Sequence, residues 1–459
     1  MTGKDSIPRP APDVYFSHHD PDGELIIIVI FLTLVYCGLM AFFILGGLRL
    51  GRARDAVPRQ GEVARGRRFD SGSAASAASA AGSHANAFPF ARSESSRSRT
   101  AFAGPAPGES SLAESAAGES EDSDYPYLPS VSVIVPMRNE EAHAPATLLA
   151  LSNQDYAGEW EIICVDDRST DGTEAVIRGF CARNGRFSLV SVPADAPRIA
   201  SPKKRALAAG FAAAKGEVLM TTDADCLAEP GWLRSMATRF AADTGIVQGP
   251  KRIRGNGTVL SRYQEHEVFG LVSIEAATFA LGRPMIASAP SLAYRKTLYE
   301  SVGGFQGIED SISGDDDLLV RKMQKVPHWK VAYNPSAEAC VTTSPAATWK
   351  EMLQQRARWA SNGAHYEEKG FVALLSCVYA FYWWLALGPF LAAAGLVPWA
   401  LYAATVAAKI ACNGLFLGIT SRRLGHSGIL RDLIWCEILH VPIVLAAVIL
   451  GHLGLYRWK

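Results

Sequence analysis

The sequence predicts an α/β domain with a mostly parallel sheet, joined to transmembrane helices. Apolar, β-branched segments alternate with helical patterns between about residues 128 and 366, which is typical of a parallel sheet covered by helices. Acidic side chains lie at the carboxyl ends of three of these strand-like segments. Four long apolar segments lie outside this region, one before it and three after it. These three observations define the predicted organisation.

The first apolar segment, residues 25–48, carries no charge and is long enough to span a bilayer. Acidic residues precede it and a run of arginines follows it, so the positive-inside rule places the following chain in the cytoplasm. We therefore expect residues 1–24 to be non-cytoplasmic. Residues 49–127 are basic and then rich in Ala, Ser and Gly, which predicts a disordered linker.

Residues 369–459 are predicted to form three membrane helices, with spans at about 371–391, 399–419 and 433–453. Arginines between the last two spans favour a cytoplasmic loop there, which places the C-terminus outside. The basic end of the chain conflicts mildly with that arrangement, and an interfacial last segment is the alternative. We expect an integral protein of a bacterial inner (cytoplasmic) membrane, with the α/β domain in the cytoplasm.

Lys409 and Glu437 lie inside these apolar segments. Ionisable groups at membrane depth face other protein groups or a polar cavity. We predict that the two side chains pair with each other, and a polar path for an acceptor headgroup is the alternative.

The α/β region, residues 128–368, contains a regular series of elements. Residues 131–136 predict a buried strand through their β-branched side chains. The other elements follow in order: helix 144–152, strand 161–165, helix 174–181, strand 188–192, helix 203–215 and strand 217–222.

Asp223 and Asp225 follow the last of these strands with one residue between them. Period-2 geometry aims both carboxylates to one side, where hard oxygen ligands suit Mg²⁺ or Mn²⁺ and hence a nucleotide diphosphate. Glu140 and the pair Asp166 and Asp167 follow two other strands, so three acidic clusters meet at one sheet edge. A solvated turn or a helix cap is the alternative for each cluster alone.

The overall charge argues against a nucleic-acid partner. The chain has 45 basic and 45 acidic residues, whereas a nucleic-acid-binding protein needs a basic face.

Six motifs occur in an order that resembles family 2 glycosyltransferases. They lie at residues 131–140, 165–173, 203–207, 223–225, 314–317 and 355–359. The last one, Gln-Arg-Ala-Arg-Trp, is similar to the Q-x-x-R-W motif of the membrane-bound branch, which includes cellulose, chitin and hyaluronan synthases and ceramide glucosyltransferases. The resemblance covers about half of the chain. It implies a GT-A nucleotide-sugar-binding fold and inverting chemistry.

The resemblance also implies roles for individual residues. Asp316 is the expected catalytic base, with Asp315 beside it, and the alternative is that Asp315 is the base. An acidic first turn of the following helix, 318–324, is the structural alternative. Asp225 is the expected metal ligand, with Asp223 as its partner. The expected donor-binding residues are Glu140, Asp166, Asp167, Lys203, Asp223, Gln355, Arg358 and Trp359.

Two further points come from the same comparison. Lys203 could exchange roles with its neighbour Lys204, and a solvated helix start is the alternative for both. Ala289 and Ser291 stand where this family usually has Gly and Asn, which leaves the acceptor pocket open. Residues 355–359 could also form an amphipathic interfacial helix.

We therefore expect an inverting glycosyltransferase that moves a sugar from a nucleotide-sugar, with UDP as the expected nucleotide. Three C-terminal spans are few for a pore that threads a polymer, which favours a membrane lipid, glycolipid or carotenoid-like acceptor. The alternatives are a processive polysaccharide synthase, a nucleotidyltransferase and a non-catalytic membrane scaffold.

Overall fold

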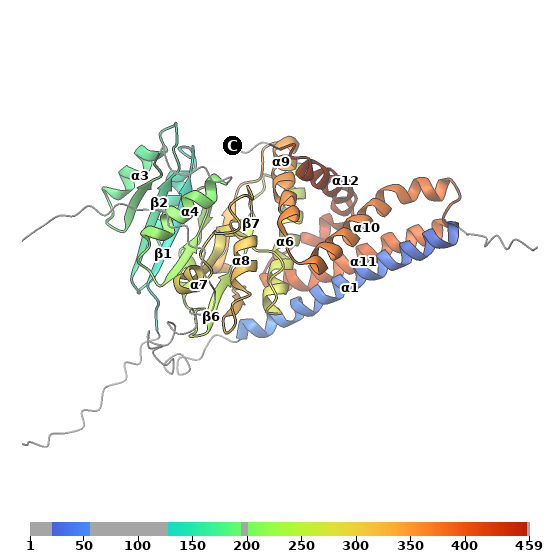
Figure 1. Cartoon of the computed structure of the whole chain (residues 1–459), viewed down its shortest axis with the longest axis horizontal. Helices are drawn as coiled ribbons and strands as arrows, with labels where there is room; N and C mark the ends of the chain where they lie inside the picture. The colour runs from blue at the N-terminus through green and yellow to red at the C-terminus, as the bar shows by residue number, and fades with distance from the viewer. Residues whose placement is uncertain (1–20, 56–126, 194–200, 457–459) are drawn as a thin grey trace, which may run out of the picture. The chain divides into compact units, whose positions relative to one another are not determined.

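The computed structural model describes residues 21–55, 127–193 and 201–456 (Figure 1). The predicted linker therefore lies mostly outside the described residues, as does most of the N-terminal segment. The described residues of 21–55 and 128–456 belong to one compact unit. That unit contains both the α/β domain and the long apolar helices.

A seven-stranded sheet forms the centre of the α/β domain, in the strand order β3-β2-β1-β4-β8-β6-β9. The four strands predicted from sequence pair in parallel, as expected. β8 is antiparallel to both β4 and β6, so the sheet is mixed. Its strands are β1 (Val131–Met137), β2 (Trp160–Asp166), β3 (Phe187–Ser191), β4 (Val218–Thr221), β6 (Thr244–Gln248), β8 (Leu292–Arg295) and β9 (Lys330–Tyr333).

Helices cover both faces of this sheet. Alternate residues of β1 enter two separate apolar cores: Val133 and Val135 join one, and Ile134 joins the other. This explains why β1 is apolar throughout. The three predicted helices are confirmed within two residues, as α2 (Ala144–Ser152), α3 (Thr173–Cys181) and α4 (Pro202–Ala213).

The domain contains further elements outside the large sheet. A small second sheet has the order β5-β10-β7. Its strands are β5 (Cys226–Ala228), β10 (Val341–Thr343) and β7 (Lys251–Ile253). The helices are α5 (Trp232–Ala237), α6 (Val259–Ala280), α7 (Lys296–Ser301), α8 (Asp317–Met323) and α9 (Trp349–Ala360).

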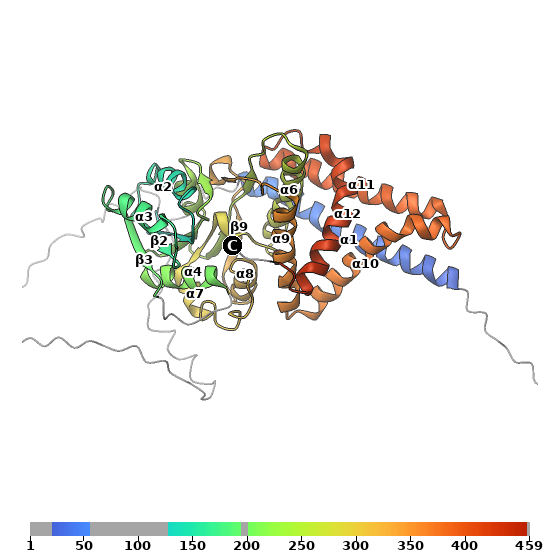
Figure 2. The ribbon, with the colours of Figure 1, turned by 90° about the horizontal axis from the view of Figure 1, so that it is seen from above.

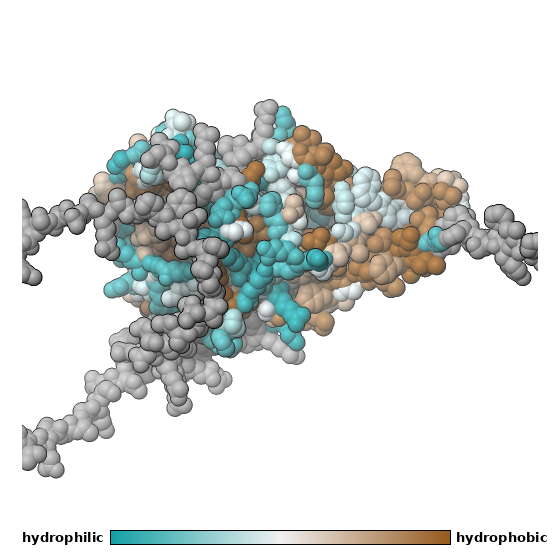
Figure 3. All heavy atoms as spheres, in the orientation of Figure 1, coloured by the Kyte–Doolittle hydropathy of each residue, from teal (hydrophilic) through white to brown (hydrophobic). Residues whose placement is uncertain are grey.

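Among the described residues, four helices are long and apolar enough to cross a membrane. They are α1 (Pro21–Asp55), α10 (Lys369–Ala393), α11 (Trp399–Leu424) and α12 (Leu433–His452). Apolar side chains gather on the surface of this helical part (Figure 3). α1 is longer than its predicted span, and its end enters the α/β domain, where Leu50 is fully buried.

The buried ion pair predicted between Lys409 and Glu437 is confirmed. Asn413 Nδ2 donates a second hydrogen bond to the same carboxylate at 2.7 Å, and Tyr36 Oη donates to Asn413 Oδ1 at 2.6 Å. These contacts join α1, α11 and α12. The carboxylate is thus compensated inside an apolar bundle, as buried charges require.

Candidate active site

A cleft of about 250 Å³ opens at the carboxyl end of β4, between the second sheet, α6 and α9. Both polar and apolar side chains line the cleft. Most of the residues predicted for the site line it: Lys203, Asp223, Asp225, Asp315, Asp316, Gln355, Arg358 and Trp359. Segments more than 150 residues apart in sequence therefore meet at one place.

Asp223 and Asp225 lie in the turn between β4 and β5, and Cys226 begins β5. Two carboxylate oxygens and the Cys226 sulfur lie within 4.8 Å of one another. Burial raises the pKa of the Cys226 thiol well above its usual range, and the thiol donates to Asp225 Oδ1 at 3.6 Å. A protonated thiol is a poor ligand, so the two carboxylates are the groups that fit a hard divalent cation.

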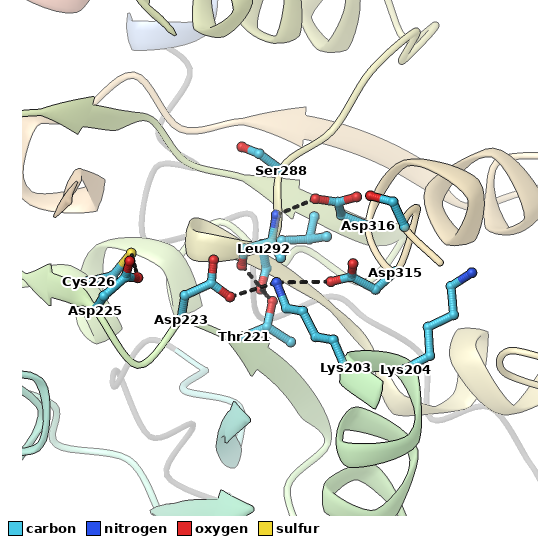
Figure 4. A network of polar contacts seen from close by, with 12 residues as sticks. Lys203, Lys204, Thr221, Asp223, Asp225, Cys226, Ser288, Leu292, Asp315 and Asp316 are labelled. Atoms are coloured by element: carbon cyan, nitrogen blue, oxygen red, sulfur yellow. Dashed lines mark hydrogen bonds and ion pairs between the residues drawn. The ribbon is translucent and has the colours of Figure 1, made fainter. Parts of the chain in front are cut away.

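Lys203 lies in the first turn of α4 and points into the cleft between two acidic residues (Figure 4). Its Nζ is 2.6 Å from Asp223 Oδ1 and 3.1 Å from Asp315 Oδ2. Burial acts against the charged ammonium, but the two carboxylates outweigh it and raise the pKa of Lys203. A fixed positive charge at a helix N-terminus is a suitable environment for a diphosphate.

Lys204 points away from the cleft, which separates the roles of the two adjacent lysines. Its ammonium is buried and donates to the carbonyl oxygens of Ile308 and Ser311, at 2.6 and 2.8 Å. Lys204 thus holds the loop that leads to α8. Ser201 caps α4 by accepting a hydrogen bond from the Lys204 amide, at 3.3 Å.

Asp316 caps α8 and lies beside the cleft. Its Oδ1 accepts from the Asp317 amide at 2.7 Å, and its Oδ2 accepts from the Ala289 amide at 2.9 Å. Burial, followed by the adjacent charge of Asp315, raises the pKa of Asp316. Asp316 therefore does lie at the start of α8, as the structural alternative predicted. The same hydrogen bonds fix the orientation of its carboxylate.

Asp315 has the opposite electrostatic environment. Burial acts to raise its pKa, but the ammonium of Lys203 outweighs burial and lowers it. The pKa values of these two adjacent carboxyl groups are therefore shifted in opposite directions. Such a difference allows paired acids to take different roles. Asp315 suits a permanent negative charge, and Asp316 suits proton transfer.

α9 supplies the opposite wall of the cleft. Thr348 caps this helix by accepting from the Glu351 amide at 3.2 Å. Arg358 Nη1 donates to Ser313 Oγ at 3.1 Å, which links α9 to the loop before α8. The Trp359 ring has the Lys251 ammonium at 5.5 Å and the Arg356 guanidinium at 4.5 Å from its centroid.

Gln355 accepts a hydrogen bond from Arg356, which also forms a buried ion pair with Glu267 at 2.6 Å. Gln355 is thereby oriented along the cleft wall. Both arginines of the motif line the cleft: Arg356 is held by its ion pair with Glu267, and Arg358 is held by its hydrogen bond to Ser313.

Glu140, Asp166 and Asp167 lie at the ends of β1 and β2 and do not line this cleft. Asp167 is buried and receives two hydrogen bonds from Arg205 Nη2, at 2.9 and 2.7 Å, so its hydrogen-bonding capacity is largely used within the fold. Glu140 pairs with His143 at 2.9 Å. Asp166 Oδ2 accepts from the Ser169 amide at 3.3 Å, whereas its buried Oδ1 has no hydrogen-bond partner among the described residues.

Sequence reasoning missed several residues of the cleft, chiefly Glu275 of α6. Glu275 is 2% exposed, and burial raises the pKa of its carboxyl to about 7. Ser288 Oγ donates to Glu275 Oε2 at 3.2 Å. A single acidic residue within an otherwise apolar helix segment is a signal that could have identified it.

The segment in which Ala289 and Ser291 depart from the family pattern serves the fold. The Ala289 amide holds Asp316, as described above. Ser291 Oγ accepts from Trp232 Nε1 at 3.0 Å and donates to the Ala339 carbonyl at 2.9 Å. Ser291 is fully buried and is therefore a packing residue.

Comparison with known families agrees with this arrangement. Glycosyl transferase family 2 matches residues 132–303, and Glycosyl transferase family group 2 matches residues 218–450, slightly more than half of the chain. The chain belongs to glycosyltransferase family 2. Its mixed, mostly parallel sheet is the GT-A fold that the motifs implied.

Two bacterial relatives illustrate how far the similarity of this glycosyltransferase extends. It is 30% identical over 259 residues to the probable glycosyltransferase YdaM of Bacillus subtilis (strain 168), covering 54% of this chain and 58% of the relative. It is 29% identical over 244 residues to an N-acetylglucosaminyltransferase of Rhizobium meliloti (strain 1021), covering 51% and 55%. The chain thus matches somewhat more than half the length of these relatives.

Among solved structures, the glycosyltransferase is similar to a mannosyltransferase, PcManGT from Pyrobaculum calidifontis, in complex with GDP-Man and Mn²⁺. The two are 21% identical with a TM-score of 0.46, over 71% of this chain and 87% of that one.

Proposed function

We propose that this glycosyltransferase moves a sugar from a UDP-sugar to a lipid, glycolipid or carotenoid-like acceptor in the membrane, with inversion at the sugar carbon. The observation that supports this most directly is the position of Lys203 between Asp223 and Asp315, next to Asp316. One cleft thus contains groups for a metal-bound diphosphate and a carboxylate suited to proton transfer.

The donor end of the cleft comprises Asp225, Asp223, Lys203 and Arg358. Asp225 and Asp223 would hold Mg²⁺ or Mn²⁺, which when bound neutralises charge on the departing nucleoside diphosphate. Lys203 and Arg358 add fixed positive charge at the same place. Glu140, Asp166 and the adjacent Asp167 are assigned to binding of the nucleotide base and ribose. The buried Oδ1 of Asp166, which has no hydrogen-bond partner among the described residues, supports that role.

Asp316 is assigned as the general base. It accepts the proton of the acceptor hydroxyl while the hydroxyl oxygen forms a bond to C1 of the sugar and the bond from C1 to the diphosphate oxygen breaks. The two backbone amides on Asp316 fix its orientation, so little reorganisation is needed during the reaction. One such displacement inverts the configuration at C1.

A lipid acceptor is supported by the apolar side of the cleft. Val268 and Leu271 of α6 and Ile286 line it. α6 also packs against α1 and α12, two of the helices that are apolar enough to enter a membrane. Trp359 supplies an apolar wall nearby. A hydroxyl on a membrane lipid could therefore reach Asp316 from the membrane side, with the catalytic domain on the cytoplasmic side of a bacterial inner membrane.

The decisive experiment is an assay of membranes containing the enzyme with radiolabelled UDP-sugars and Mn²⁺. UDP-N-acetylglucosamine is the first donor to test, because the Rhizobium relative is named for that sugar. We expect label in an organic-extractable product, and none with membranes containing the Asp316→Asn protein. Label in a polymeric product would instead indicate the polysaccharide synthase, and transfer of the nucleotide would indicate a nucleotidyltransferase.

A further inference from the structure

Helix α6 presents one stripe of side chains to the cleft. Gln264, Val268, Leu271 and Glu275 belong to this helix and all line the cleft. Their spacings of 4, 3 and 4 residues place them along one face, since an α-helix has 3.6 residues per turn. The stripe is apolar in its middle, at Val268 and Leu271, and polar at its two ends. The two polar ends differ in how they are bound within the protein.

Gln264, at one end of the stripe, is held by the fold. Its Nε2 donates to the Ala346 carbonyl oxygen at 3.0 Å, and its Oε1 accepts from the Ala346 amide at 2.9 Å. Both polar atoms of this side chain are therefore used to fix the segment that precedes α9.

Glu275, at the other end, has one carboxyl oxygen that the described part of the chain does not use. Ser288 Oγ donates to Oε2 at 3.2 Å, whereas Oε1 receives no hydrogen bond from any described residue. Burying a carboxyl without partners for its oxygens costs free energy, because those oxygens lose their hydrogen bonds to water. Since Glu275 lines the cleft, a bound molecule can supply the missing hydrogen bond.

Glu275 lies close to the proposed base. Ser288, which binds Glu275, is directly followed by Ala289, whose amide donates to Asp316 Oδ2 at 2.9 Å (Figure 4). Gln248 fixes this pair of residues, since its Oε1 accepts from the Ser288 amide at 3.2 Å and its Nε2 donates to the Ser288 carbonyl at 3.1 Å. Adjacent residues therefore hold the two carboxyls, so one bound molecule can contact both.

The apolar middle of the stripe offers a surface for a hydrocarbon chain. Val268 and Glu275 are seven residues apart, which corresponds to about 10 Å along the helix. Ile286 adds apolar surface to the same cleft. Figure 2 shows α6 between the sheet and the long apolar helices, and α6 packs against α1, α11 and α12. The stripe therefore belongs to the side of the cleft that adjoins the membrane helices.

We propose that Glu275 binds the acceptor, and that the acceptor is a lipid with a second hydrogen-bond donor, a hydroxyl or an amide N–H, within a few bonds of the hydroxyl that reacts. The reacting hydroxyl lies at Asp316, the second group donates to Glu275 Oε1, and the chain lies along Val268 and Leu271. This inference rests on the proposed transfer to a lipid and narrows its acceptor. A lipid with one isolated hydroxyl would leave Oε1 unpaired, and a site of this kind discriminates against such a molecule.

The test is a binding competition on the purified, detergent-solubilised enzyme with UDP and Mn²⁺, measured by native mass spectrometry. A long-chain 1-alkanol is mixed in equal amount with the 1,2-diol of the same chain length and, in a second arm, with the 1,3-diol. We expect at least one diol to occupy the enzyme about tenfold more than the alkanol, because a site built for a hydroxyl disfavours an analogue that lacks it. Equal occupancy by the alkanol and both diols would overturn the proposal.

Two variants assign the preference to Glu275. Glu275→Leu should bind diol and alkanol equally, since leucine cannot accept a hydrogen bond, whereas Glu275→Gln should keep most of the preference through its amide oxygen. Glu300→Gln, at an exposed position on α7, is the control and should match wild type. A folded Glu275→Leu protein that still prefers the diol would overturn the proposal. Thermal unfolding shows which variants are folded, and the wild-type comparison stands without them.

The same alcohols then serve as acceptors for a radiolabelled UDP-sugar, which tests the proposed function separately. Selective binding of a diol without transfer would support this acceptor site and contradict the proposed reaction. Equal binding of all three alcohols together with transfer to each would support the proposed reaction and overturn this inference.

Discussion

The ammonium of Lys203 lies 2.6 Å from Asp223 Oδ1, and this ion pair joins the start of α4 to the end of β4. The same ammonium lies 3.1 Å from Asp315, in the loop before α8. Lys203 therefore compensates carboxylates from two parts of the cleft. If Asp223 holds a cation as proposed, Lys203 would compete with that cation, and its removal should affect cation binding and catalysis in opposite directions.

We predict that Lys203→Met tightens Mn²⁺ binding in the absence of nucleotide by about tenfold, which corresponds to about 1.4 kcal/mol for a partly exposed ion pair. Turnover should fall by about 100-fold or more, because positive charge near the leaving diphosphate is lost. Titration with Mn²⁺ and donor kinetics measure the two effects. Lys215→Met, at an exposed position just after α4, should change neither quantity. Weaker or unchanged Mn²⁺ binding in Lys203→Met would contradict this account.

Asp316→Asn should lower transfer by about 10²- to 10⁴-fold, the usual contribution of a general base, while leaving UDP affinity unchanged. The asparagine can still accept one of the two backbone hydrogen bonds, so the loop should keep its shape. Asp315→Asn removes a partner of Lys203 and should mainly raise the KM for donor. The opposite result, an active Asp316→Asn protein and an inactive Asp315→Asn protein, would assign the base to Asp315.

Glu275→Gln should change how stability depends on pH. Burial raises the pKa of Glu275 from 4.5 to about 7, so the folded protein holds this proton more tightly than the unfolded chain does. The wild-type protein should therefore lose up to about 3 kcal/mol of stability as the pH rises from about 4.5 to 7. A glutamine cannot titrate, so the variant should become relatively more stable over that interval.

Thermal unfolding at pH 5 and pH 8 measures this difference. Glu300→Gln, at an exposed position on α7, is the control and should show the wild-type pH dependence. A Glu275→Gln protein whose stability relative to wild type is the same at both pH values would show that the carboxyl does not titrate in this range.

The parallel half of the sheet could be predicted from the sequence because each of its strands is a short apolar run, which is a local feature. β1, β2 and β4 are apolar runs with acidic residues at or shortly after their carboxyl ends, and their bounds agree with prediction to within one or two residues. The antiparallel half could not be predicted in the same way. β8 has four residues, and its pairing with β4 and β6 depends on contacts distant in sequence.

The candidate site shows the same limit. The order of the motifs grouped Lys203, Asp223 and Asp316 in one site. It could not decide between Lys203 and Lys204, because the rotation of α4 about its axis places one lysine in the cleft and the other against the loop before α8. Glu275 lies outside the quoted motifs and reaches the site through the packing of α6. The orientation of α12 depends on contacts such as Gly451 with Ala357, which hydropathy does not record.

The most direct test of the central claim is the affinity of the purified, detergent-solubilised enzyme for UDP with and without Mn²⁺, measured by calorimetry. We predict at least about tenfold tighter binding with Mn²⁺, because a cation held by Asp225 and Asp223 would neutralise the charge of the diphosphate. Asp225→Asn should remove this difference, and Glu300→Gln should retain it. Equal affinity with and without the cation, for UDP and for every nucleotide-sugar tested, would contradict the account.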